Sequence, residues 1–401
     1  MKPSFQVPTR RFGRTGLDMP VLSCGGMRFQ HSWKDLPLSE VPAESQENLA
    51  ALVRQSASVG MRHLETARGY GTSEVQLGEI LESYPREQWI LQTKVGPRED
   101  GEEFKKVVAT SLSNLRVDHV DLLALHGINN AELLDLSLKR GGSLEAALEL
   151  KKDGICRHVG FSTHAPLEVI LRAIDTGAFD YINLHWYYVM QANRPAIDAA
   201  KKHDMGVFII SPTDKGGRLF EPPPKLVELC RPLSPIAFND LFCLACPDVH
   251  TLSLGAAKAS DLDEHVEAMK RLPEAAALTG PIASRLDAEQ ERALGADWVA
   301  HGLDGVSPWE ELPGEINVRE IVRLWNLATS LDLVAYAKAR YNLLGQAEHW
   351  FPGENAGKLD PVAMGEALAE APFRDRILEV LSLAHRDFAE APKKRLSESS
   401  P

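Results

Sequence analysis

The chain has 401 residues, of which 44% are hydrophobic and 25% are charged, and its formal net charge is −12. This length suits a barrel of about 250 residues with a further module, and the apolar content is enough for a sizeable core. The acidic balance argues against nucleic acids and anionic membranes as partners, because both select clustered Lys and Arg.

The sequence predicts a cytoplasmic protein. No stretch reaches the roughly 20 apolar residues that a membrane helix needs, and the opening segment MKPSFQVPTRRFG lacks the apolar core of a secretion signal. The five cysteines are too few and too scattered for a disulfide framework. They are Cys24, Cys156, Cys230, Cys243 and Cys246.

The first part of the chain alternates short apolar runs with longer amphipathic segments. Before the first run, RRFGRTGLDMP has a central Thr-Gly turn and predicts a hairpin that closes the bottom of a barrel. Eight runs, each with a helical companion, predict an α/β fold of the (β/α)8 TIM-barrel type. The runs cover residues 21–25, 62–66, 89–93, 120–125, 157–161, 181–185, 207–211 and 249–254.

The pattern changes after about residue 275. Helical segments remain, strand signals vanish, and GLDGVSPWEELPGEIN is a Pro- and Gly-rich loop. We therefore expect a barrel over residues 1–274, an all-α extension over 275–391 and a disordered tail over 392–401. The basic run Lys393, Lys394 and Arg395 belongs to that tail.

Four chemically distinct side chains stand at or just after predicted strand ends: Glu65, Tyr70, Lys94 and His126. A parallel barrel brings such ends together on one face. An acid, a phenol, an amine and an imidazole are the parts needed to pass a proton to a carbonyl oxygen. The alternative is that Tyr70 is a loop aromatic and His126 a core histidine.

In their order along the chain, several motifs resemble the aldo/keto reductase superfamily over roughly residues 10–270. They are GRTGL, ETARGYG with SEVQLGEIL, TKVG, DLLALH, RHVGFS, SPTDKGG and SLGAAKASDLDEHVEAM. The resemblance implies a barrel that binds a nicotinamide dinucleotide without a Rossmann domain, and no G-x-G-x-x-G lies between a strand and a helix.

The resemblance also implies the reaction, which is reduction of an aldehyde or ketone to an alcohol with NAD(P)H. Tyr70 would be the general acid, and Lys94 would supply a cation that lowers the pKa of the phenol. His126 would orient the carbonyl, and Glu65 would hold Lys94. The family usually has Asp at position 65, and a misplacement of about 1 Å from the added methylene can cost about 100-fold in rate.

Further residues are assigned to the nicotinamide by the resemblance. Ser162 and Asn183 align with residues that hold the carboxamide, and Trp186 aligns with an aromatic that stacks on the ring. The alternatives are strand-end capping for the first two and core filling for Trp186. Thr163-His164 replaces the family's usual Asn after the serine.

Two glycine-containing segments are expected to face the phosphates. After the seventh strand, Ser211, Lys215, Gly216 and Gly217 offer backbone amides and one cation, although an ordinary glycine turn is the alternative.

After the eighth strand, Gly255 opens a predicted helix, and Lys258 is the cation there. Asp261 stands where NADP-preferring members place an arginine, and its charge would repel a 2′-phosphate. NADP is the expected cofactor by a small margin over NAD.

The mouth of the barrel is expected to hold the carbonyl substrate. Met27 and Arg28 follow the first strand, and Gly25 and Gly26 would leave space for substrate or cofactor. Trp33 lies in a predicted rim loop, where a substrate contact and an inconsequential surface aromatic are equally compatible with the sequence.

The C-terminal segments VREIVRLWN and YAKARYNLL resemble a ferredoxin-like helical module that some of these proteins append. Its two cluster-binding loops correspond to GLDGVSPWEELPGEIN and EHWFPGENAGKLDPV, which contain no cysteine, so we expect no iron–sulfur cluster. Cys243 and Cys246 form a C-x-x-C that is expected to be buried rather than redox-active or metal-binding.

Two other functions remain open at this level. Glu65, the altered Ser162-Thr163-His164 and Asp261 also fit a nucleotide-binding pseudoenzyme or sensor with weak or no turnover. The helical extension also fits a scaffold that docks a protein partner.

Overall fold

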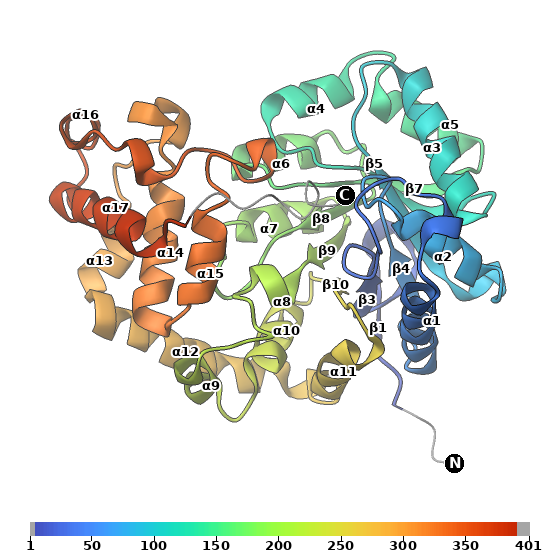
Figure 1. Cartoon of the computed structure of the whole chain (residues 1–401), viewed down its shortest axis with the longest axis horizontal. Coiled ribbons are helices and arrows are strands. Elements are labelled where there is room, and N and C mark those ends of the chain that lie inside the picture. Colours follow the sequence, from blue (N-terminus) through green and yellow to red (C-terminus); the bar gives the residue numbers. More distant parts are fainter. Residues whose placement is uncertain (1–4, 391–401) are drawn as a thin grey trace. The chain divides into compact units, whose positions relative to one another are not determined.

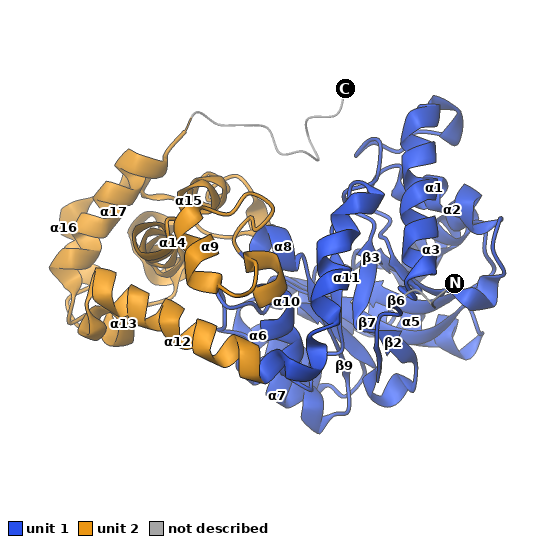
Figure 2. Cartoon of the chain, turned by 90° about the horizontal axis from the view of Figure 1, so that it is seen from below, with its two compact units in different colours: residues 1–216, 239–276, 395–401 blue, residues 217–238, 277–394 orange. Residues whose placement is uncertain are grey.

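The computed structural model describes residues 5–390, and its described part forms two compact units. Within the described residues, the first unit contains 5–216 and 239–276, and the second contains 217–238 and 277–390 (Figure 2). The predicted tail over 392–401, with Lys393, Lys394 and Arg395, lies outside the described residues.

Eight parallel strands of the first unit close into a barrel (Figure 1). The order around it is β10-β3-β4-β5-β6-β7-β8-β9. All eight predicted runs form strands, so the TIM-barrel prediction is confirmed. The strands are β3 (Leu22–Gly25), β4 (His63–Glu65), β5 (Ile90–Val95), β6 (Val120–Leu125), β7 (Cys156–Ser162), β8 (Tyr181–Leu184), β9 (Gly206–Ile210) and β10 (Thr251–Leu254).

The predicted hairpin is also present. β1 (Thr9–Arg11) pairs antiparallel with β2 (Asp18–Pro20). The hairpin carries Phe12 and Met19 into a fully buried cluster with Tyr181 and Phe208 of the barrel strands. A Cβ at Gly206 would lie 2.6 Å from the Phe12 ring, so this glycine makes room for the side chain that plugs the barrel bottom.

Helices follow the strands, as the right-handed β-α-β pattern requires. Those of the first unit are α1 (Ala43–Ser58), α2 (Ser73–Leu81), α3 (Gly101–Leu115), α4 (Ala131–Leu138), α5 (Ser143–Lys152), α6 (Leu167–Asp175), α7 (Arg194–Lys202), α8 (Pro212–Lys215) and α11 (Asp263–Met269). α10 (Pro235–Ala245) begins in the second unit and ends in the first.

The described part of the second unit is helical. It contains α9 (Pro224–Cys230), most of α12 (Ala275–Leu294), α13 (Ala296–His301), α14 (Val318–Leu331), α15 (Val334–Tyr341), α16 (Pro361–Ala367) and α17 (Arg374–Phe388). The sequence predicts one helical stretch where α14 and α15 lie. Asp332 adopts a left-handed conformation between them (φ 56°) and ends the first helix.

The two loops that would carry cluster ligands in a ferredoxin-like module contact each other directly. The amide of Asn317 donates to the carbonyl of Glu354 at 3.0 Å, and the amide of Glu354 donates to Glu315 at 2.8 Å. These backbone bonds hold the two loops together. The expectation that the module binds no iron–sulfur cluster stays a prediction.

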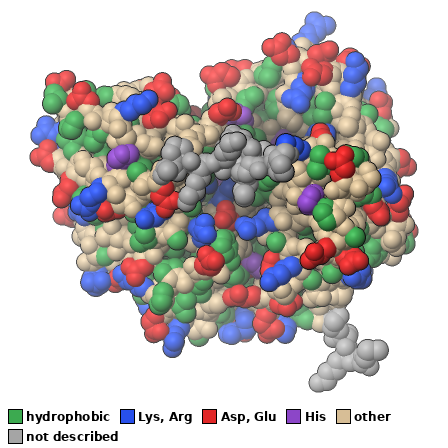
Figure 3. Space-filling view, viewed as in Figure 1, with side chains coloured by type: hydrophobic (Ala, Val, Ile, Leu, Met, Phe, Trp, Pro, Cys, Tyr) green, Lys and Arg blue, Asp and Glu red, His purple; other side chains and the backbone are tan. Residues whose placement is uncertain are grey.

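No helix within residues 5–390 is long and apolar enough to cross a membrane. On the face shown in Figure 3, the described acidic and basic side chains are interspersed.

Candidate active site

The carboxyl ends of neighbouring strands bring the predicted acid, amine and imidazole to one end of the barrel. Glu65 ends β4, Lys94 is the penultimate residue of β5, and His126 directly follows β6. These strands are neighbours in the closed sheet (Figure 1). Tyr70 follows in the turn before α2, where its amide donates to the carbonyl of Ala67 at 3.0 Å.

Lys94 is the centre of the cluster and is 2% exposed. Its ammonium forms an ion pair with Oε2 of Glu65 and donates to the carbonyl of Thr66 at 2.8 Å. Its Nζ also lies 4.9 Å from the centroid of the Tyr70 ring. The phenol and the ammonium therefore share one pocket.

The pKa values of this pair reflect opposing effects. Burial lowers the pKa of Lys94, but the charges of Glu65 and of the Tyr70 phenolate outweigh it, so the pKa is raised. Burial of the hydroxyl raises the pKa of Tyr70, and Lys94 offsets this only in part. Lys94 does lower the pKa of the phenol, as the sequence predicts, but desolvation of the phenolate by burial is the larger effect, so the net shift is upward.

Two rings flank Tyr70 edge-on. His126 lies at a centroid distance of 5.6 Å and Trp33 at 6.1 Å, each with an interplanar angle of 83°. The rim loop thus brings Trp33 beside Tyr70.

The extra methylene of Glu65 is accommodated between three strands. Oε1 accepts a 2.7 Å hydrogen bond from the hydroxyl of Ser253 on β10, while Oε2 faces Lys94 on β5. A Cβ at Gly25 would lie 2.6 Å from the Ser253 hydroxyl and 3.1 Å from Oε1.

The prediction that Gly25 and Gly26 leave space for substrate or cofactor is therefore wrong. The missing side chain of Gly25 makes room for Glu65 and Ser253. A Cβ at Gly26 would lie 2.7 Å from the carbonyl of Glu65 and 2.9 Å from the Ser73 hydroxyl. Protein atoms fill both positions.

Asn183 meets the requirement for a carboxamide partner. It lies on β8, is fully buried, and neither its Oδ1 nor its Nδ2 has a hydrogen-bond partner among residues 5–390. An amide with both ends unpaired can match the donor and acceptor of a second amide. Ser162 pairs laterally with Asn183, and its hydroxyl accepts from the amide of Gly127 at 3.0 Å.

Trp186 packs against protein on its ring faces and is 4% exposed. Phe242 stacks on it at 5.1 Å and 24°, and the Arg194 guanidinium lies 5.9 Å from its centroid. This packing is what the core-filling alternative predicts. Stacking on the nicotinamide ring stays a prediction.

Sequence reasoning missed an imidazole cluster around Lys215. The ring nitrogens of His164 and His185 approach to 3.2 Å, and Nζ of Lys215 lies 3.5 Å and 3.4 Å from them. The three residues follow β7, β8 and β9, so strand order was the signal that could have found them.

The expected phosphate turn after β9 is a single helical turn, α8, which begins after Ser211 in a left-handed conformation (φ 53°). A Cβ at Gly216 would lie 2.0 Å from the carbonyl of Pro212, so the turn itself requires this glycine. Gly217 begins the second unit.

The segment after β10 is capped by its own acid. Oδ2 of Asp261 accepts from the amides of Ala257 at 2.9 Å and Lys258 at 3.2 Å. The amides predicted to face a phosphate are thus already bonded to a carboxylate. Arg28 lies over Gly255, where a Cβ would be 2.9 Å from its Cδ, and Met27 is half-buried beside it in the chain.

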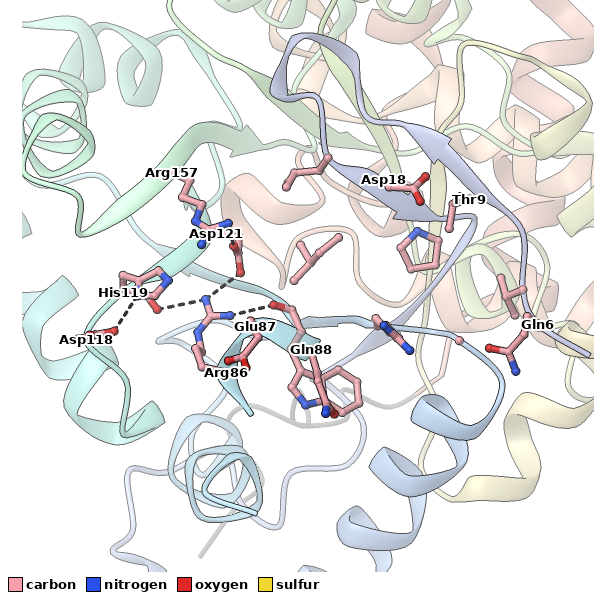
Figure 4. A pocket seen from close by; sticks show the side chains of 17 residues that line it. Gln6, Thr9, Asp18, Arg86, Glu87, Gln88, Asp118, His119, Asp121 and Arg157 are labelled. Carbon is pink, nitrogen blue, oxygen red and sulfur yellow. Dashed lines mark hydrogen bonds and ion pairs between the residues drawn. The ribbon is translucent and has the colours of Figure 1, made fainter. Parts of the chain in front are cut away.

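A cavity of about 710 Å³ lies at the opposite, amino-terminal end of the barrel (Figure 4). Asp121 there pairs with Arg86 at 2.7 Å and Arg157 at 3.3 Å, and Asp118 pairs with His119 at 2.6 Å. Internal pairing at this end of a TIM barrel serves stability, whereas catalysis uses the carboxyl end.

Cys243 and Cys246 are buried and carry free thiols. The thiol of Cys243 faces the carbonyl of Trp186 at 3.3 Å. Within residues 5–390, no three His, Cys, Asp or Glu side chains gather as metal ligands.

Comparison with known proteins identifies the family. Residues 21–222 match the model of the aldo/keto reductase family. L-galactose dehydrogenase of Arabidopsis thaliana is 24% identical over 300 residues, which cover 67% of this chain and 89% of that protein.

Solved structures share the fold. Aldo-keto reductase AKR11C1 from Bacillus halodurans, in its holo form, has a TM-score of 0.58 at 22% identity, covering 70% of this chain and 96% of its own. An aldo-keto reductase from Klebsiella pneumoniae in complex with NADPH has a TM-score of 0.54 at 18% identity, covering 68% and 95%. The chain belongs to the aldo/keto reductase family and is an NAD(P)-dependent oxidoreductase.

Proposed function

We propose that this protein reduces an aldehyde or ketone to an alcohol with NAD(P)H, and that the Tyr70 hydroxyl gives its proton to the carbonyl oxygen. The observation that carries the proposal is the buried ammonium of Lys94, which is bonded to Glu65 and to the carbonyl of Thr66 and lies 4.9 Å from the centre of the Tyr70 ring. A buried cation costs free energy unless it is fully paired. Such an arrangement beside a half-buried phenol is typical of a tuned proton donor.

Each side chain has a distinct role in this proposal. Lys94 stabilises the tyrosinate that forms as the proton leaves, which offsets the burial that raises the pKa of Tyr70. His126 lies edge-on to the phenol and would donate to the same carbonyl oxygen. Trp33 would pack against the substrate and exclude water.

The nicotinamide dinucleotide supplies the hydride when it is bound. Asn183 supports this choice of cofactor, because its buried amide has both polar ends available for the carboxamide. The Klebsiella pneumoniae neighbour, which is described with NADPH, favours NADPH. Asp261 disfavours binding of the 2′-phosphate, because its carboxylate already accepts hydrogen bonds from the amides of Ala257 and Lys258. NADPH is tested first, with NADH as the alternative.

The pseudoenzyme alternative depends mainly on Glu65. The longer side chain reaches Lys94 and has a second partner in Ser253, so the carboxylate still holds the ammonium in place. This geometry favours turnover over binding alone.

The test is nucleotide oxidation by the purified full-length chain. It uses NADPH and NADH with aldehydes, ketones and aldoses, and L-galactose is included with NAD(P)⁺ in the oxidative direction because of the Arabidopsis thaliana relative. At least one pair should turn over, and Tyr70→Phe should lose about 100-fold or more of the rate.

Two results would contradict the proposal. One is full activity in Tyr70→Phe. The other is inertness with every pair although nucleotide still quenches tryptophan fluorescence, which would identify a sensor.

A further inference from the structure

The carboxylate of Glu65 divides its two oxygens between two neighbouring elements of the barrel. Oε2 faces the ammonium of Lys94, and Oε1 accepts from the hydroxyl of Ser253 at 2.7 Å. Ser253 is 4% exposed and Glu65 is 4% exposed, so water does not compete for either contact. Ser253 lies 188 positions away in the chain and on the far side of β3.

The ammonium of Lys94 has three N–H groups to distribute. One faces Oε2 of Glu65, and one donates to the carbonyl of Thr66 at 2.8 Å. The third is left for Tyr70, whose ring centroid lies 4.9 Å from Nζ. If Oε1 also turned to the ammonium, the carboxylate would take two of the three donors.

Gly25 on β3 has no side chain, and this makes room for the contact between the acid and Ser253. Among residues 5–390, the hydrogen-bond partners of this carboxylate are Ser253 and Lys94, so a carboxylate that loses its Ser253 bond turns toward Lys94. A glutamate at position 65 therefore needs a second anchor.

We propose that Ser253 is a positioning residue that holds one carboxylate oxygen of Glu65 beside Gly25 and so keeps the third N–H of Lys94 for Tyr70. The inference rests on the proposed function for its kinetic consequences, although the positioning itself can be tested without turnover. An aspartate at position 65 is one methylene shorter and would not span both partners, so the role belongs to the glutamate.

The first experiment is kinetic. Ser253→Ala should lower kcat about tenfold, within the roughly 100-fold that a displacement of 1 Å can cost, and should leave the KM for nucleotide within about twofold. Ser253→Thr keeps the hydroxyl and should restore the rate. In a Glu65→Asp background, Ser253→Ala should change kcat by less than about twofold, because the contact it removes is already absent.

The matched control is Ser23→Ala. Ser23 is another buried barrel hydroxyl, bonded to Nδ1 of His63 and Oγ1 of Thr251 at 2.7 Å each, and it does not touch Glu65. Its loss should affect stability and leave kcat near wild type. Equal losses of kcat in the two alanine variants would mean that barrel packing alone explains the effect and would overturn the proposal.

The second experiment follows the ionisation of Tyr70 by the ultraviolet absorbance of tyrosinate, with Tyr70→Phe subtracted. Ser253→Ala should shift this titration to higher pH, because Lys94 donates less to the phenol. An unchanged or lowered titration would overturn the proposal. If the tyrosinate titration shifts in Ser253→Ala but the protein reduces no carbonyl, the positioning role is supported and only the proposed function is rejected.

Discussion

Removing the charge of Glu65 should destabilise the barrel strongly. Glu65→Gln keeps the shape of the side chain but leaves the 2%-exposed ammonium of Lys94 without its anionic partner. Breaking one side of a buried pair costs about 3–5 kcal/mol. Each kcal/mol lowers Tm by about 2 °C in a unit of about 250 residues, which is the size of the first unit, so we expect a loss of about 6–10 °C.

The decrease of Tm in Glu65→Gln should depend on pH in a defined direction. Burial lowers the pKa of Lys94, and in the variant the opposing charge of Glu65 is absent. The unfolded chain then binds a proton more tightly than the folded one, so stability rises with pH above the folded pKa. The Tm difference between variant and wild type should narrow between neutral pH and about pH 10, which differential scanning calorimetry can follow.

The decisive comparison is the double variant Glu65→Gln/Lys94→Met. It removes the uncompensated charge and should recover most of the lost Tm, since apolar replacement of a buried pair is often neutral. Glu74→Gln is the matched control, because it removes a buried carboxylate that is not a partner of Lys94. Glu74 is instead bonded to Thr93 at 2.7 Å and lies 3.5 Å from Arg68. If the double variant is no more stable than Glu65→Gln, the unpaired ammonium is not the cause.

Three further outcomes are expected. Burial lowers the pKa of His250 to about 4, so the folded protein resists a proton that the unfolded chain accepts below pH 6.5. The free energy of unfolding therefore decreases as the pH falls from 6.5 to 4. When this free energy is measured by urea titration at each pH, His250→Gln should reduce its slope against pH by up to about 1.4 kcal/mol per pH unit. Equal slopes in the variant and the wild type would contradict the assignment. Asp261→Asn should improve kcat/KM for NADPH relative to NADH by about tenfold, equivalent to about 1.4 kcal/mol, and an unchanged ratio would mean that this carboxylate does not face the 2′-phosphate. A chain that ends at residue 276 should bind a hydrophobic dye and aggregate. In such a chain segment 217–238 loses its contacts with α12, where Arg285 donates to the carbonyl of Leu229 at 2.8 Å. A monodisperse product that binds no dye would contradict this prediction.

The architecture follows from local pattern. Each barrel strand is a short apolar run bounded by turn residues, and the helix that follows it shows apolar residues at helical spacing. Both elements can therefore be located in the sequence without long-range information. The hairpin before the first strand is local in the same way. Asp332 shows the limit, because a helical stretch that is continuous in the sequence ends there in a left-handed residue.

The sequence by itself determined that an acid, an amine and an imidazole meet at one end of the barrel, because parallel strands in chain order have adjacent carboxyl ends. Only the tertiary structure decided the partners of that acid. Ser253 reaches Glu65 through closure of the barrel, which places β10 next to β3 and leaves only a glycine position between them. Contacts between the last and first strands depend on register and on absent side chains, and neither leaves a signal in the sequence near Glu65.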